Sequence, residues 1–325
     1  MSEKNDNLLS VRDLVVEYTS GGEIIHAVNG VSFELEKGKT LGLVGETGAG
    51  KTTIAKSILR VLLSPPAKVK SGEILLEGTD LLKVREDEML KIRGAKISMI
   101  FQDPMTALNP TMTIGNQIAE GIRLHNDVSA LEAEKMAIDM LQSVRIMEER
   151  FHEYPFQFSG GMKQRVVIAM ALACKPKLLL ADEPTTALDV TIQAQVLDTM
   201  RDLRNQLGTS MILITHDLGI VAENCDTVAV IYAGQIVESG SKEDIFDHAS
   251  HPYTVGLFHS LPMWAMGEKR LHPIDGLPPD PRIEPNGCMF RFRCPRATKA
   301  CEATVPNAEL TSGHFCRCIA PKEEV

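Results

Sequence analysis

The sequence predicts an α/β fold with an inserted helical subdomain and a C-terminal extension rich in proline and cysteine. Three observations lead to this prediction. Short apolar runs alternate with helical patterns in the early and late parts of residues 1–262, as expected for buried strands linked by helices. Residues 112–150 show helical periodicity and no strong strand pattern, so we expect a helical subdomain at about residues 105–175. After about residue 262 prolines and cysteines replace both patterns, which indicates a separate extension over residues 263–325.

The N-terminal residues are expected to form an antiparallel β subdomain. Residues 8–17 and 31–35 are candidate strands. Gly21-Gly22 and Glu36-Lys37-Gly38 are turn signals beside them.

Strands and helices alternate again after residue 177. A helix is expected at residues 190–207, and Ala233-Gly234 is expected to turn a hairpin. The predicted strands are residues 178–181, 211–214, 228–231 and 235–238.

Composition limits the partners of the chain. The 325 residues carry a net charge of −9, and 44% of them are hydrophobic. An acidic chain lacks the basic face that a broad nucleic-acid contact requires, so we expect no nucleic acid partner. No run of about 18 apolar residues is present, and the N-terminus lacks the apolar core of a signal peptide. We therefore expect a protein that stays in the cytosol and that, if it serves a membrane, docks on other subunits that cross it.

A glycine-rich sequence between a predicted strand and a predicted helix indicates a phosphate-binding loop. It follows the apolar run Leu41–Val44 and precedes a helical pattern at Thr52–Leu63. The loop is Gly45-Glu46-Thr47-Gly48-Ala49-Gly50-Lys51-Thr52, which fits G-x-x-x-x-G-K-[ST] and is followed by Thr53. Glycines let successive N–H groups face the phosphates, and the positive end of the helix favours the anion. We expect Lys51 to reach the β- and γ-phosphates of ATP and the Thr52 hydroxyl to bind Mg²⁺.

Two carboxylates follow a second apolar strand. Asp182 and Glu183 end the sequence Lys177-Leu-Leu-Leu-Ala-Asp-Glu. In a nucleotide hydrolase we expect Asp182 to orient Mg²⁺ and Glu183 to act as general base toward the attacking water.

The residues around these motifs resemble the conserved sequences of ABC ATPases. Phe158-Ser159-Gly160-Gly161-Met162 resembles the signature sequence, whose usual form is Leu-Ser-Gly-Gly-Gln. Gln102, in Phe101-Gln-Asp-Pro104, is similar to the glutamine of the Q-loop, and Ala187-Leu188-Asp189 is similar to the D-loop. His216 resembles the switch histidine, and Tyr18 stands where the family has an aromatic residue that stacks on adenine.

A narrower resemblance extends over nearly the whole chain. The sequences at 104–110, 158–165, 168–172 and 287–295 resemble the D-type ATPase of dipeptide and oligopeptide importers, a group that includes nickel importers. Met162 departs from the family because it replaces the signature glutamine, and we expect the neighbouring Ser159, Gly160 and Gly161 to preserve function.

The resemblance implies a P-loop ATPase core that hydrolyses ATP between two subunits. The signature residues and Asp189 of one subunit would face the nucleotide held by the other. Gln102 would sense Mg²⁺ and the water, and His216 would hold the γ-phosphate and the water in line. The implied partners are a second, F-type ATPase subunit, two membrane-spanning permease subunits and an extracytoplasmic solute-binding protein. Peptides are the expected cargo, whereas nickel or another small solute, and a non-transport ABC ATPase, stay open as alternatives.

Five of the seven cysteines lie in the last 40 residues. Cys288, Cys294, Cys301 and Cys318 form a Cys₄ set that could hold a [4Fe–4S] cluster or Zn²⁺, and the absence of any metal stays open as a third alternative. Cys318 is preferred to the neighbouring Cys316 because its surroundings resemble the last cysteine of the family. The gaps are wider than in common zinc sites, which favours the cluster, with Phe290, Phe292 and Phe315 expected to exclude water.

Overall fold

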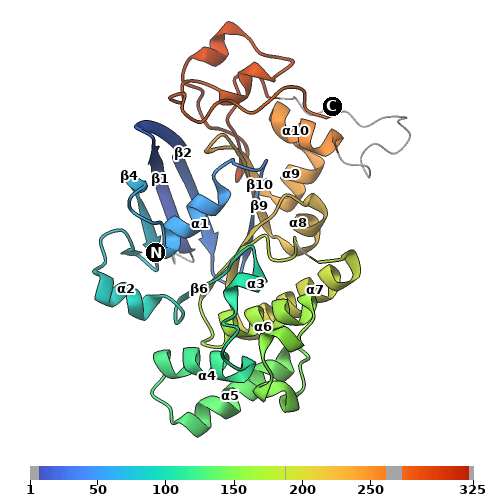
Figure 1. Cartoon of the computed structure of the whole chain (residues 1–325). Helices are drawn as coiled ribbons and strands as arrows, with labels where there is room; N and C mark the ends of the chain where they lie inside the picture. Colours follow the sequence, from blue (N-terminus) through green and yellow to red (C-terminus); the bar gives the residue numbers. More distant parts are fainter. Residues whose placement is uncertain (1–6, 187, 261–272, 322–325) are drawn as a thin grey trace, which may run out of the picture. The chain divides into compact units, whose positions relative to one another are not determined.

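The computed structural model describes residues 7–186, 188–260 and 273–321 (Figure 1). These residues form two compact units. Within these ranges, unit 1 contains residues 7–8, 35–40 and 79–214. Unit 2 contains residues 9–34, 41–78 and 215–321 with the gap at 261–272. The expected boundary at residues 262–263 lies outside the described residues.

Unit 2 begins with antiparallel strands. They are β1 (Asn7–Ser20), β2 (Glu23–Glu36) and β4 (Ala67–Leu76), and β1 lies between the other two. In the β1–β4 pair Leu9 is opposite Leu76, and Tyr18 is opposite Ala67. Both strands predicted in this part of the sequence are therefore found, and the turn at Gly21-Gly22 separates them.

A second group of strands in unit 2 carries the phosphate-binding loop. β3 (Thr40–Val44), all of whose residues are buried, runs parallel to β9 (Thr227–Tyr232). A strand buried along its whole length is typical of a parallel sheet covered on both faces. The predicted hairpin at Ala233-Gly234 is confirmed, because it leads into β10 (Gln235–Ser241), which is antiparallel to β9.

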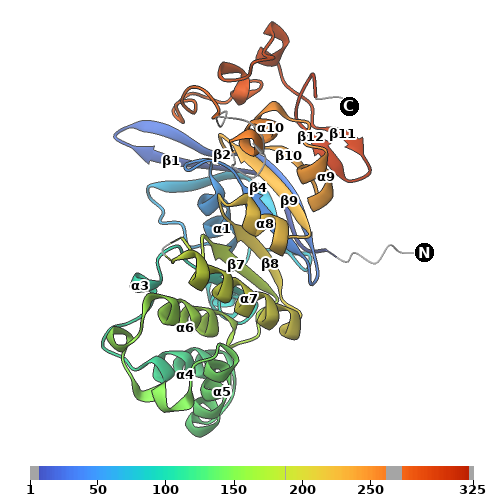
Figure 2. The same cartoon turned by 90° about the vertical axis from the view of Figure 1, so that its right-hand side faces the viewer.

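The C-terminal extension adds strands to this group. β12 (His314–Cys316) pairs with β10, and β11 (Ala308–Thr311) pairs with β12 (Figure 2). The sequence indicated a separate extension, whereas these two strands continue the sheet that contains β10. The pairing could not be predicted from the sequence, because the prolines over residues 273–285 interrupt any regular strand pattern before β11 and β12.

The helices of unit 2 are short. They are α1 (Lys51–Leu59), α8 (Leu218–Asn224), α9 (Lys242–Asp247), α10 (Pro252–His259) and the 3₁₀ helices η3 (Met289–Phe292) and η4 (Lys299–Glu302). The prediction of a helix up to Leu63 is wrong at its C-terminal end. Arg60 takes a left-handed conformation at φ 53°, and its N–H bonds to the carbonyls of Lys56 and Ser57, which ends the helix.

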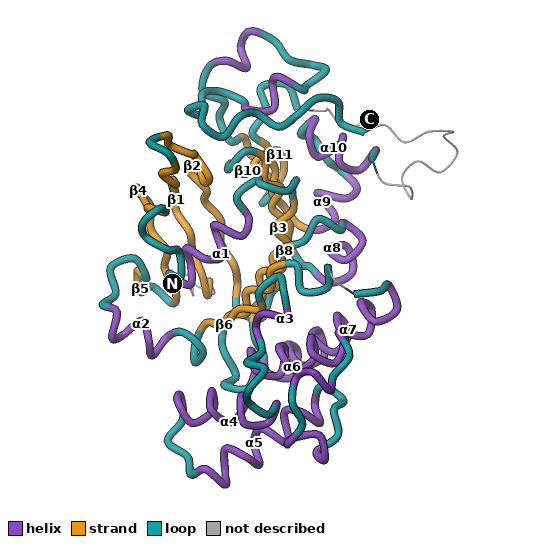
Figure 3. The backbone as a smooth tube through the Cα atoms, viewed as in Figure 1, coloured by secondary structure: helices purple, strands orange, loops and turns teal. Residues whose placement is uncertain are grey.

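Unit 1 contains a parallel sheet and most of the long helices. The strands β6 (Ile97–Ile100), β7 (Leu178–Asp182) and β8 (Ser210–Ile214) lie in the order β8-β7-β6, and β5 covers only Thr79–Asp80. The helices are α2 (Glu86–Ile92), α3 (Pro104–Ala107), α4 (Ile114–His125), α5 (Ala130–Ser143), α6 (Gly160–Leu172) and α7 (Val190–Leu207), with 3₁₀ turns η1 (Glu148–His152) and η2 (Pro155–Gln157). Residues 105–175 form helices and loops only, and α4, α5 and α6 pack on one another (Figure 3). Over the described ranges, no helix is both long and apolar enough to cross a membrane.

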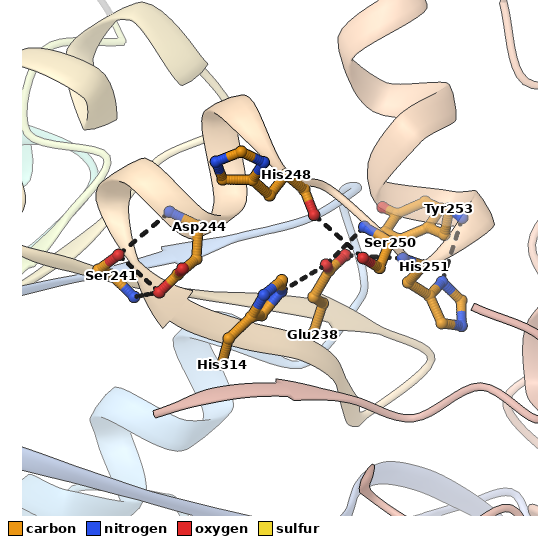
Figure 4. Close-up of polar contacts among 8 residues, drawn as sticks. All are labelled: Glu238, Ser241, Asp244, His248, Ser250, His251, Tyr253 and His314. Atoms are coloured by element: carbon orange, nitrogen blue, oxygen red, sulfur yellow. Dashed lines mark hydrogen bonds and ion pairs between the residues drawn. The ribbon is translucent and has the colours of Figure 1, made fainter. Parts of the chain in front are cut away.

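A buried carboxylate joins the extension to the rest of unit 2. Glu238, in β10, is 0% exposed and accepts bonds from the main-chain N–H groups of Ser250 (2.7 Å) and His251 (3.0 Å) (Figure 4). It also accepts from His314 Nε2 in β12 at 2.9 Å. His251 caps α10, because its Nδ1 accepts from the N–H of Tyr253 at 3.1 Å. One side chain therefore fixes β12 and the start of α10 against β10.

Replacing Glu238 by alanine is expected to lower the free energy of unfolding by about 3–5 kcal/mol, because two N–H groups and a buried histidine lose their acceptor. The measurement is urea denaturation of the purified chain. Glu243→Ala on α9 is the control, since that side chain is 68% exposed and its loss should cost about 0.5 kcal/mol or less. Equal unfolding midpoints for the two variants would contradict this role of Glu238.

Candidate functional site

The phosphate-binding loop in unit 2 is shaped by close contacts between backbones. It runs from the end of β3 to α1, as the sequence predicts. A Cβ atom at Gly45 would lie 2.1 Å from the Ile231 carbonyl oxygen, and one at Gly50 would lie 2.3 Å from that of Ala27. Gly50 also has φ 101°, which side chains rarely permit. Only glycine fits at these two positions, so the tight curve depends on them.

Lys51 lies inside the loop that it is expected to serve. Its side chain is buried, and its Nζ donates to the carbonyls of Gly45 (2.7 Å) and Glu46 (2.9 Å). The first turn of α1 contains no acidic residue, so the positive end of the helix is not opposed there. The loop can therefore receive an anionic phosphate at the N-terminus of α1.

Two further predicted residues lie in unit 2, one in β1 and the other just before α8. Tyr18 is half-buried, and its hydroxyl lies 3.2 Å from that of Thr53 in the first turn of α1. The structure thus brings the expected adenine-stacking residue beside the phosphate-binding loop. His216 is exposed just before Asp217, whose carboxylate caps α8.

In unit 1 the candidate general base is held by two polar neighbours. Glu183 accepts bonds from Gln102 Nε2 at 3.0 Å and from Thr186 Oγ1 at 2.9 Å. Its backbone has φ 47°, a left-handed conformation that is strained for glutamate and typical of functional positions. Asp182, at the end of β7, is 2% exposed. The structure therefore brings Gln102 and Glu183 together, and it adds Thr186, which the sequence reasoning did not single out although it lies only three residues after Glu183.

The signature residues lie at the N-terminus of α6. Ser159 is exposed, and a Cβ atom at Gly161 would lie 2.3 Å from Ile192 in α7, so glycine allows α6 and α7 to pack closely. Asp189 caps α7 by accepting from the N–H of Ile192 at 3.0 Å. Met162, the departure from the family sequence, contacts Arg150 Nη1 through its sulfur at 3.2 Å. Ala187 of the D-loop lies outside the described residues.

The four selected cysteines of the extension line one pocket. Cys288, Cys294, Cys301 and Cys318 all border it, together with Phe290 and His251. Burial raises the pKa of the Cys288, Cys294 and Cys318 thiols above the usual value. Such thiols stay protonated at neutral pH unless a metal displaces the proton. By contrast, Cys316 is fully buried in β12 opposite Glu238.

One of the residues that line the pocket, His251, has a buried ring nitrogen without a hydrogen-bond partner. The Nδ1 of His251 accepts a hydrogen bond, so the proton of the neutral ring lies on Nε2, and this buried Nε2 has no hydrogen-bond partner. Burial lowers the pKa of His251 to about 4, which keeps the ring neutral at pH 7. Phe292, expected to exclude water here, is 63% exposed. Over the described ranges, no three histidine, cysteine or acidic side chains are placed so that they could hold one metal ion.

Comparison with known proteins defines the class. A model of the ABC transporter family matches residues 28–186, and a model of the C-terminal region of oligopeptide/dipeptide transporters matches residues 237–301. The structure of the dimeric ATP-binding cassette MJ0796 in a post-hydrolysis state, bound to ADP and Pi, superposes with a TM-score of 0.65 at 27% identity, covering 72% of this chain and 98% of that one. The fold and the phosphate-binding loop are thus those of an ABC-type ATPase.

Relatives that match over nearly the full length give the family. The dipeptide transport ATP-binding protein DppD of Bacillus subtilis is 49% identical over 316 residues, which cover 96% of this chain and 94% of the relative. The oligopeptide transport ATP-binding protein OppD of Escherichia coli is 44% identical over 326 residues, which cover 99% of this chain and 96% of the relative. The chain belongs to the family of ATP-binding proteins of dipeptide and oligopeptide ABC transporters. The resemblance inferred from the motifs is confirmed.

Replacing Gly50 by alanine is expected to raise the dissociation constant for ATP by about tenfold or more. The new methyl group would overlap the Ala27 carbonyl and displace the loop. Titration with a fluorescent ATP analogue measures the dissociation constant. Gly30→Ala is the matched control, since Gly30 also has a positive φ (75°) but nothing within 4 Å of the added Cβ. If both variants bind equally well, the close approach at Gly50 does not shape the site.

Proposed function

We propose that the chain is the ATP-hydrolysing subunit that powers ABC-type import of dipeptides or oligopeptides across the cytoplasmic membrane. The observation that carries the proposal is the combination, in one chain, of the phosphate-binding loop with a C-terminal region of the oligopeptide/dipeptide transporter type. Its relatives of similar length are named for dipeptide and oligopeptide transport. The proposed partners are an F-type ATPase subunit, two permease subunits and a solute-binding protein, with this chain bound peripherally at the cytoplasmic face.

The predicted site residues have the following proposed roles in hydrolysis. Lys51 and the N–H groups of the loop bind the β- and γ-phosphates, and Thr52 and Asp182 hold Mg²⁺. Glu183 accepts the proton of the attacking water, and the bonds from Gln102 and Thr186 orient its carboxylate. His216 holds the γ-phosphate in line. The helix dipole of α6 and the exposed Ser159 suit the signature residues to a nucleotide bound by a second subunit.

The cysteine pocket is proposed to hold a [4Fe–4S] cluster, with Zn²⁺ as the alternative. Four thiols of the kind that either group requires border one pocket. They would have to move closer together to bind it, because no three of the described side chains are placed to hold one metal ion. The buried Nε2–H of His251 supports the proposal, because a cluster or thiolate sulfur would give this donor the acceptor that it lacks. A bound cluster would cross-link the segments of the extension and provide a redox centre. The residues that hold it are Cys288, Cys294, Cys301 and Cys318.

Glu183→Gln is expected to bind ATP but to hydrolyse it at least about a hundredfold more slowly. The amide of glutamine cannot accept the proton of the attacking water. Phosphate release by the complex with its partner subunits measures turnover, and Glu149→Gln, an exposed glutamate of η1, is the control. Near-normal turnover in Glu183→Gln would reject the base assignment.

The same variant tests the transport function. Deletion of the gene is expected to abolish uptake of radiolabelled di- and oligopeptides. The wild-type chain and Glu149→Gln should restore uptake, and Glu183→Gln should not. If deletion leaves peptide uptake unchanged and abolishes nickel uptake instead, the cargo is nickel, and if neither uptake changes, the importer function is wrong.

The chain purified without oxygen is expected to absorb broadly near about 400 nm and to contain iron and sulfide in equal amounts. Cys288→Ser should lose this absorbance, because it removes a ligand from the pocket. Cys174→Ser, outside the extension, should keep it. A colourless protein with one zinc ion per chain would establish the alternative, and a protein with neither iron nor zinc would reject both.

A further inference from the structure

The C-terminal extension reaches the phosphate-binding loop through one arginine. Nη1 of Arg293 donates to both carboxylate oxygens of Glu46, the second residue of the loop, at 3.1 and 2.9 Å. The Arg293 side chain is 5% exposed and that of Glu46 is 27% exposed. Charges shielded from water in this way interact more strongly than a pair on the open surface.

The extension holds the arginine in place through main-chain carbonyls. Nε of Arg293 donates to the carbonyl of Asp275 at 3.0 Å, and Nη2 donates to that of Ile274 at 3.2 Å. The guanidinium also lies over the ring of Tyr232, 5.8 Å from its centroid. A guanidinium with this many fixed contacts is preorganised, so it can fix the position of Glu46 in turn.

The main-chain N–H, the main-chain carbonyl and the carboxylate of Glu46 all have interaction partners within unit 2. Its N–H donates to the hydroxyl of the fully buried Tyr253 at 3.0 Å, and its carbonyl accepts from Lys51 at 2.9 Å. Its carboxylate is held by Arg293. The loop is therefore anchored by α10 and by the segment around Arg293, both of which come after residue 250.

A carboxylate in a loop that receives a triphosphate creates an electrostatic conflict. The phosphates carry several negative charges, and a nearby unpaired carboxylate would repel them. Arg293 removes that repulsion, because its charge cancels that of Glu46 at contact distance.

We propose that Arg293 is a positioning residue of the ATP site, which neutralises Glu46 and fixes the phosphate-binding loop, so that the C-terminal extension contributes directly to the affinity for ATP. The inference rests on the ATPase function proposed above. Sequence reasoning did not find this residue, although Arg293 immediately precedes Cys294 in the family-like sequence at 287–295.

Arg293→Gln is expected to raise the dissociation constant for MgATP roughly tenfold, with a smaller increase for MgADP, because the unpaired Glu46 carboxylate repels the more highly charged nucleotide more strongly. The measurements are equilibrium titrations with both nucleotides, together with KM and kcat of the assembled complex. KM should rise and kcat should stay within roughly twofold, as for an interaction made equally in the ground and transition states. Arg282→Gln is the matched control, because that arginine of the extension pairs with Asp280 and Glu23 and is 54% exposed.

A second substitution separates charge neutralisation from simple unfolding. In the background of Glu46→Gln, the change from Arg293 to glutamine should alter the MgATP dissociation constant by less than about twofold, because no carboxylate remains to be neutralised. A full loss in that background, or equal losses for ATP and ADP, would mean that Arg293 acts only on the fold and would overturn the proposal. Unchanged binding in Arg293→Gln would overturn it as well. Absence of hydrolysis in the wild-type chain would instead reject the ATPase function, and the binding titrations would still decide the role of Arg293.

Discussion

The shape of the phosphate-binding loop depends on two close contacts between backbones. In each contact a carbonyl oxygen lies where the Cβ atom of a loop residue other than glycine would be. The Ile231 and Ala27 oxygens approach Gly45 and Gly50 so closely that a methyl group at either position would overlap them. Ile231 belongs to β9, which pairs in parallel with the strand that leads into the loop, and Ala27 belongs to β2. The curve of the loop is thus set by the strands of unit 2, and the N–H groups and Lys51 are held where a phosphate can use them.

The contacts made by residues after 250 extend this constraint. Tyr253 holds the main chain of Glu46 and Arg293 holds its carboxylate, so a loop found in many nucleotide-binding proteins is here supported by a C-terminal region of the oligopeptide-transporter type. Glu238 underlies the first of these supports, because it fixes the start of α10, and it also holds the strand β12. A buried carboxylate with three donors is stable only when all three stay in place, which makes this part of unit 2 cooperative.

Two unfavourable features, a strained backbone in unit 1 and an unpaired buried nitrogen in the extension's pocket, occur at residues with proposed functional roles. The left-handed backbone of Glu183 is unfavourable for a glutamate, and it places the carboxylate where Gln102 and Thr186 both reach it. In the extension the buried Nε2 of His251, which has no protein partner, borders the same pocket as four thiols. Each feature is unfavourable for folding alone, and this is the physical reason behind the roles proposed for these residues.

The sequence by itself determined the strands and helices of the core, the phosphate-binding loop and the family, because apolar periodicity and short motifs depend on neighbouring residues. Both ends of helix α7, residues 190 and 207, were predicted correctly. The C-terminal end of α1 was predicted four residues too late, because no residue pattern indicates the left-handed conformation of Arg60 that ends the helix. Only the tertiary structure decided that β12 joins β10, that Arg293 pairs with Glu46, and that Cys318 borders the pocket while Cys316 lies in the sheet. These are contacts between residues up to 247 positions apart, and no local pattern encodes which distant side chains meet once the chain has folded.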